Sequence, residues 1–160
     1  MATQAGILVA AIGAKLATAF PTYDILYGLP DDSAAYIGDG QKIVIRYLEE
    51  EAQAAGNGLG GLVNVRPRVS ILLRRPYATG TASALATHQA TLDIAADLRQ
   101  AVTAMVLANA DQSAPIANLG GSLWITDCRT LPSVVDIGTG SYESVSVEFG
   151  FRLTRNYGDR

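Results

Sequence analysis

The chain has 160 residues, of which 49% are hydrophobic and 17% charged, and its formal net charge is −3 at pH 7. This length suits one domain, residues 1–160, able to bury roughly 70% of the surface that the unfolded chain exposes. The negative charge excludes bulk attraction to nucleic acid or to an anionic membrane, and the low charge density suits a subunit that buries much of its surface.

The amino-terminal segment Thr3–Phe20 predicts a helix, which Pro21 ends. Its apolar residues recur at three- and four-residue steps: Ile7, Leu8, Ala11, Ile12, Leu16 and Ala19. No positive residue precedes this apolar run, and Lys15 interrupts it, so the pattern favours neither a signal peptide nor a membrane-spanning helix. We therefore expect a protein made in the cytoplasm, with no membrane partner.

Two strands are expected next, a short one over Tyr23–Tyr27 and a stronger one over Lys42–Leu48. The segment that follows, Glu49–Gly61, has an acidic run and then small residues. It is longer than a hairpin turn needs, and its composition is typical of a flexible connection. We expect an extended hairpin loop there that becomes ordered on assembly.

Strict alternation of apolar residues marks two further strands, Val63–Arg75 and Ser141–Asn156. In the first the apolar face consists of Val63, Val65, Val69, Ile71 and Leu73. In the second it consists of Val145, Val147, Phe149, Phe151 and Leu153. Both patterns are typical of half-buried strands, so these two segments are expected to share one core.

A long helix is predicted over Ala84–Ala108, with one buried stripe formed by Thr91, Ala95, Leu98, Val102 and Met105, flanked by Leu92, Ile94, Ala101 and Val106. Ser122–Thr126 predicts a short strand, and Val134–Gly140 leads into the last one. The order of elements predicts an α+β fold. We expect a mixed, mostly antiparallel sheet packed on a central long helix, with an additional N-terminal helix.

Residues suited to catalysis are few and lack motif spacing. His88 is the single histidine and Cys128 the single cysteine, which excludes an internal disulfide and a thiolate-rich metal site. The glycines of Gly56–Gly61 enter a strand and not a helix, unlike a phosphate-binding loop. We expect Cys128 to be structural and at least half-buried, and we expect no cofactor, no metal and no enzymatic activity. A small hydrolase using Asp127, Cys128 and His88 is the alternative class.

Charged residues gather on the 42–75 region. Arg66, Arg68 and Arg74 alternate with the apolar face of their strand, and Arg75 follows, while acids concentrate at Glu49–Glu51. These charges could pair within one hairpin, pair across a subunit boundary, or bind phosphate. The candidate subunit-interface residues are therefore Glu49, Glu50, Glu51, Arg66, Arg68, Arg74 and Arg75.

Four segments together resemble the tail-terminator and head-tail completion proteins of long-tailed bacteriophages. They are RPRVSILLRRPY, THQATLDIAADLRQAV, SLWITDC and SYESVSVEFGFRLTRN, and the likeness spans Ile7–Asn156. The likeness lies in the order of the elements and the character of their residues. A strand that starts with Arg-Pro is followed a few residues later by a helix, and a final alternating strand has a basic residue at its end. The longer Glu49–Gly61 segment and the Ala-rich first helix depart from that pattern.

The resemblance implies a structural protein of the virion, assembled in the cytoplasm of the host bacterium. It implies a homo-oligomeric ring, usually of six subunits, that caps the tail tube and joins it to the neck and head. Its partners would then be the tail tube protein and a neck, stopper or connector protein, and DNA would only pass through the lumen as cargo. A neck stopper, a connector and a tail tube subunit are the alternatives within this class.

Overall fold

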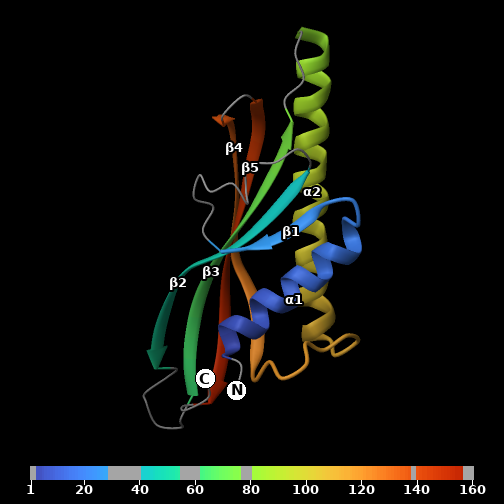
Figure 1. Cartoon of the computed structure of the whole chain (residues 1–160). Helices are drawn as coiled ribbons and strands as arrows, with labels where there is room; N and C mark the ends of the chain where they lie inside the picture. Colours follow the sequence, from blue (N-terminus) through green and yellow to red (C-terminus); the bar gives the residue numbers. More distant parts are fainter. Residues whose placement is uncertain (1–2, 29–40, 55–61, 77–80, 138–139, 157–160) are drawn as a thin grey trace.

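The computed structural model describes residues 3–28, 41–54, 62–76, 81–137 and 140–156 (Figure 1). The described chain has an α+β fold. Its elements, in chain order, are α1 (Gln4–Ala19), β1 (Asp24–Tyr27), β2 (Lys42–Ala54), β3 (Leu62–Pro76), α2 (Thr81–Ala110), β4 (Ser122–Ile137) and β5 (Gly140–Asn156).

The strands form one mixed five-stranded sheet with the order β1-β2-β3-β5-β4. The short β1 runs parallel to β2, and every other pair of neighbours is antiparallel. β5, the last strand in the chain, lies between β3 and β4 (Figure 1). The two segments with matching alternation are thus direct neighbours, with Val65 opposite Leu153 and Leu73 opposite Val145.

One face of the sheet, which we call the inner face, carries both helices. α1 lies against β1, β2 and α2, whereas α2 lies against β4 and β5 (Figure 1). The apolar residues predicted for the two alternating strands point to this face, and all but the half-buried Val63 are fully buried. The opposite face, which we call the outer face, carries the alternate residues, including Arg66 and Arg68.

The first helix agrees with its prediction within one residue at each end. The Thr3 hydroxyl caps it by accepting a hydrogen bond from the Gly6 N–H at 3.1 Å. Leu8, Ile12 and Leu16 are fully buried in the core. Ala19, also expected on the apolar stripe, is exposed because it lies at the last helical position, beyond the contact with the sheet.

The second helix extends beyond the predicted Ala84–Ala108 at both ends. Its predicted stripe, Thr91, Ala95, Leu98, Val102 and Met105, is buried as expected. Leu92 was expected beside this stripe, but it is 38% exposed and shares its side of the helix with the exposed Ala96 and Arg99. Leu85 and Leu107 are exposed as well.

Two predicted boundaries are wrong. Glu49–Ala54, expected as part of a loop, continues β2, because a one-residue bulge at Leu48 lets it keep its pairing with β3 as far as Val63. The remainder of the expected loop, 55–61, lies outside the described residues. Similarly, Ser122–Thr126 and the segment near Val134 belong to one strand, β4, which pairs with β5 along its whole length.

Candidate functional site

The candidate site lies on the outer face, where four neighbouring strands are irregular at the same level. β2 has its bulge between Tyr47 and Glu49, and β4 has one between Ile125 and Asp127. Between them, the β3–β5 ladder is interrupted at Arg66 and Pro67. Proline has no N–H to donate, so a break at this point is expected. The irregular level therefore crosses the sheet from β2 to β4.

One row of residues crosses the four strands at this level: Glu49, Arg68, Gly150 and Asp127. Arg68 Nη2 lies 2.6 Å from Asp127 Oδ2, and Arg68 Nε lies 3.6 Å from Glu49 Oε1. The guanidinium of Arg68 on β3 thus lies between the carboxylate of Glu49 on β2 and that of Asp127 on β4. Two nitrogens of the planar guanidinium face two different carboxylates, an arrangement that the point charge of lysine does not provide.

Gly150 is what allows Asp127 to reach Arg68. The two side chains belong to β4 and β3, and β5 separates these strands. A Cβ atom at Gly150 would overlap the Asp127 carboxylate and crowd the Thr126 hydroxyl. With hydrogen alone at this position, the carboxylate passes over β5 to the arginine.

These residues line a groove of about 400 Å³ on the outer face. Its walls include Glu49, Glu50, Glu51, Arg66, Arg68, Thr126, Asp127 and Phe151. The Tyr47 hydroxyl donates to Glu50, and Gln53 Nε2 donates to Glu51 Oε1 at 2.9 Å. A groove lined by the carboxylates of Glu49, Glu51 and Asp127 and by two guanidinium groups suits a charged protein segment better than an apolar small molecule.

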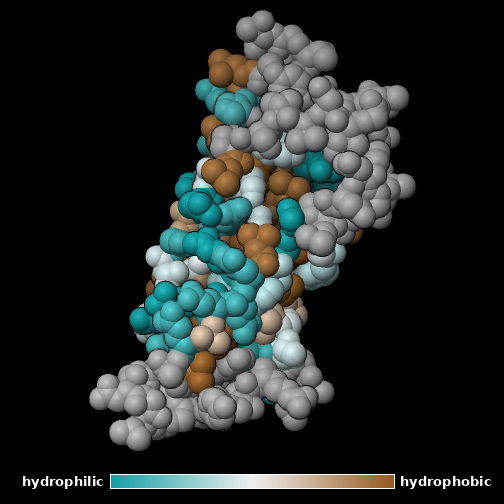
Figure 2. Space-filling view, turned by 90° about the vertical axis from the view of Figure 1, so that its left-hand side faces the viewer, coloured by the Kyte–Doolittle hydropathy of each residue, from teal (hydrophilic) through white to brown (hydrophobic). Residues whose placement is uncertain are grey.

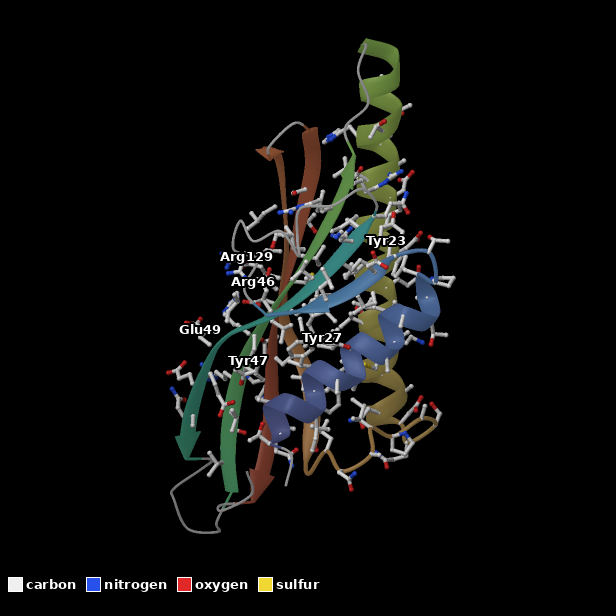
Figure 3. All side chains as sticks on the ribbon, viewed as in Figure 1. Tyr23, Tyr27, Arg46, Tyr47, Glu49 and Arg129 are labelled. Carbon is white, nitrogen blue, oxygen red and sulfur yellow. The ribbon has the colours of Figure 1, made fainter. Side chains whose placement is uncertain are left out.

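The outer face around the groove is also polar, and Figure 2 shows hydrophilic residues gathered over its described middle part. Arg129 Nη2 lies 2.8 Å from Glu148 Oε2, and the Ser70 and Ser146 hydroxyls are 2.9 Å apart. Glu49, Arg46 and Arg129 project on the side away from the helices (Figure 3). The site is therefore part of a wider charged surface.

The structure divides the predicted interface residues into two groups. Glu49, Glu50, Glu51, Arg66 and Arg68 come together at the groove. Arg74 is only 9% exposed, and Arg75 Nη1 points to α2, where it donates to Thr91 Oγ1 at 3.4 Å. Pairing within the hairpin, one of the three alternatives, holds for Arg68 and Glu49. Arg74 is buried and Arg75 half-buried, and neither lines the groove.

Sequence reasoning missed Asp127 and Gly150 as partners of Arg68. A signal for Gly150 was present, because an isolated glycine inside an alternating strand marks a bulge or a close approach. Asp127 gave no comparable signal. Its reach depends on the bulge at Thr126, which the sequence pattern does not reveal.

The residues of the alternative, a small hydrolase, do not form one site. Asp127 belongs to the outer face, whereas the adjacent Cys128 pairs with Phe149 and belongs to the inner face. Cys128 is exposed at the sheet edge, so the expectation of a buried thiol is wrong. Partial burial raises the pKa of the Cys128 thiol; the Arg99 charge lowers this pKa and the Asp127 charge raises it further. His88 is exposed on α2.

In the part of the chain that the structure describes, no three or more His, Cys, Asp or Glu residues gather as ligands for a metal ion. Among the same residues, neither helix has the length and apolar character needed to cross a membrane.

Replacing Asp127 by Asn is expected to lower the free energy of unfolding by about 0.5–1 kcal/mol, because both partners are partly exposed and solvent screens the pair. A double-mutant cycle with Arg68→Met, measured by urea denaturation, isolates the interaction. The Arg129–Glu148 pair is the matched control, and a smaller coupling is expected there because Arg129 is 59% exposed. Equal coupling energies in the two cycles would contradict a special role for Arg68.

No model of a known protein family matches the chain, and no curated protein matches it either.

Proposed function

We propose that this protein is a structural subunit of a long-tailed bacteriophage, a tail terminator that forms a ring on the end of the tail tube and joins it to the neck. The proposal starts from the resemblance of four sequence segments to that family. Under it, the ring consists of six copies, the sheet packs on α2 as its central helix, and DNA crosses the lumen only as cargo.

One structural observation carries the proposal: within the described residues, the sheet has an open strand edge on each side. In the described residues, β4 pairs only with β5, and the lower half of β2 pairs only with β3. A ring needs two different surfaces on each subunit, which meet head to tail until the rotation closes. A sheet with one open edge on each side offers two such surfaces.

The charged groove supports assembly over catalysis. Its charges partly pair with one another through Arg68, and Asp127 and Cys128 lie on opposite faces of the sheet. Arg66, Glu50 and Glu51 are exposed and remain accessible to a neighbour or to the lumen. Such partly exposed charges fix the orientation of a partner and exclude wrong partners more than they add affinity.

The oligomeric state is the first test. We expect a native mass of about six subunits in mild salt, measured by native mass spectrometry or light scattering. Charge reversal at Arg66 and Arg68 should reduce the particle mass while leaving the circular dichroism spectrum unchanged, since both side chains lie on the outer face. A stable monomer over the whole salt range would overturn the ring.

The role of the ring is tested in the phage itself. An amber mutation in this gene is expected to give tails of uncontrolled length that do not join filled heads, because a tube of head-to-tail contacts has no intrinsic end. Electron microscopy of the particles measures this. Free tails of normal length would favour the neck stopper or connector, and normal tails attached to heads would overturn both assignments.

A further inference from the structure

The two open edges of the sheet differ in length and position. β4 extends over 16 residues and has no partner on its far side among the described strands. β1 covers β2 only from Lys42 to Ile45, so Glu49–Gln53 also lacks a second partner within the described chain. Each edge presents a row of backbone N–H and C=O groups that a strand of another chain can pair with.

The directions of the two edge strands are opposite. β2, β3, β5 and β4 follow one another across the sheet, and each is antiparallel to the next. β2 and β4 therefore run in opposite directions, as Figure 1 shows. When two copies stand side by side in the same orientation, β4 of one copy meets β2 of the next as an antiparallel pair, the arrangement that a head-to-tail ring requires.

The bulges of the two edges lie at the same level. The register across the sheet places Glu49, Arg68, Gly150 and Asp127 in one row, directly beside both bulges. Below that row, Glu49–Gln53 on β2 corresponds to Ser122–Asp127 on β4. If two copies stand at the same height, the bulge of β2 in one copy lies beside the bulge of β4 in the next. The regular strand segments below the two bulges then lie side by side.

The charges of the two edges differ. The open part of β2 carries three consecutive exposed acids, Glu49, Glu50 and Glu51. Near Ser122–Cys128, Arg152 on β5 is exposed opposite Trp124, and Asp127 is paired with Arg68. Farther along β4, Arg129 is paired with Glu148. Attraction between these two sides would bring unlike edges together and keep like edges apart.

Exposed apolar side chains accompany both edges. Trp124 is 45% exposed and Leu131 48% exposed on β4, and Leu48 is 39% exposed on β2. Large exposed apolar groups beside a strand edge are typical of a surface that another chain covers. Aromatic residues and arginine are also the residue types enriched at protein interfaces.

We propose that Glu49–Gln53 of one copy adds to the edge of β4, near Ser122–Cys128, in a second copy of this chain, and that repetition of this contact closes the ring. The proposal rests on the proposed ring and specifies which surfaces form it. The sheet then continues from subunit to subunit, and the charged grooves of neighbouring copies form one continuous belt along the outer faces.

Cys128 is the single cysteine of the sequence, so adding one cysteine on β2 is enough to test this contact by disulfide formation. Leu48 and Glu50 are exposed and lie within three residues of the level of Cys128, because the register across the sheet aligns Tyr47, Val69, Phe149 and Cys128. Within one chain, β3 and β5 separate these positions from Cys128, roughly 14 Å at about 4.8 Å per strand. A disulfide needs a Cα separation below about 7 Å, so any bond between them must join two copies.

The experiment is oxidation of assembled Leu48→Cys and Glu50→Cys proteins with copper phenanthroline, followed by non-reducing gel electrophoresis. We expect at least one of them to give a ladder of covalent species from dimer up to the ring. Lys15→Cys, exposed on α1, is the matched control and should give no ladder. Cys128→Ser combined with Glu50→Cys should abolish the ladder, because the second cysteine of each link is then absent.

Measurement of the native mass distinguishes a failure of this contact from a failure of the proposed ring. Rings of wild-type mass without a ladder in either cysteine variant would overturn this contact and leave the ring standing. A monomeric wild-type protein would overturn both. As an independent measurement, Glu50→Lys with Glu51→Lys should raise the dissociation constant of the ring roughly ten-fold or more. Asp93→Lys with Asp97→Lys, exposed on α2, should leave it unchanged; equal effects of the two pairs would overturn the contact.

Discussion

Phe149→Ala is expected to unfold the subunit or to lower its free energy of unfolding by about 3–5 kcal/mol, out of a total of about 5–15 kcal/mol for a domain. Phe149 is 1% exposed and Phe151 is 0% exposed, and their rings stack with centroids 5.8 Å apart. They lie on β5, between β3 and β4, so removing either ring leaves a cavity that only backbone movement could fill.

Urea denaturation and thermal melting of Phe149→Ala and Phe151→Ala measure this loss. Leu131→Ala on β4 is the control, because Leu131 is 48% exposed and its truncation should cost little in the isolated subunit. A wild-type melting temperature for either phenylalanine variant would mean that the inner face of β5 is not part of the core.

Gly150→Val is expected to destabilise the protein by about 1–3 kcal/mol, although valine is favoured in strands. The added Cβ would occupy the space through which the Asp127 carboxylate passes, so Asp127 must turn away from Arg68. That movement breaks the row of charges across the sheet and leaves Arg68 with Glu49 alone. Chemical denaturation measures the cost.

A second variant distinguishes this explanation from general crowding. In an Asp127→Ala background the carboxylate is absent, so Gly150→Val should cost less than in the wild-type chain. The difference between the two costs is the coupling between Gly150 and Asp127. Equal costs in both backgrounds would show that valine clashes with something other than Asp127.

The periodic segments were predictable because each obeys one simple rule. Val145–Leu153 alternates without a break, and the buried stripe of α2 from Thr91 to Met105 follows helical spacing. In both cases burial on one face of a regular element decides the pattern, so local sequence carries the information. The α+β class followed from the order of these elements.

The lower half of β2 was not predictable by the same reasoning. Glu49–Gln53 is acidic and polar, and every side chain in it is exposed, so no hydrophobic alternation marks it. Its strand conformation comes from pairing with Asn64–Arg68, a partner later in the chain. Tertiary pairing overrides local propensity here. The candidate site was incomplete for the same reason, since Asp127 reaches Arg68 only through the bulge and across Gly150.

The position of β5 has a consequence for biosynthesis. β5 is the last strand, yet it fills the gap between β3 and β4, and its pairing with β3 joins residues as far apart in the chain as Leu62 and Asn156. Pairing between residues so far apart in the chain forms slowly, and the strands synthesised earlier stay exposed until it forms. During translation, β4 has no neighbour in the sheet until β5 leaves the ribosome. A chain truncated before β5 therefore lacks the neighbour that holds β4 in the sheet, and under the proposed ring it could not present the β4 edge to another copy.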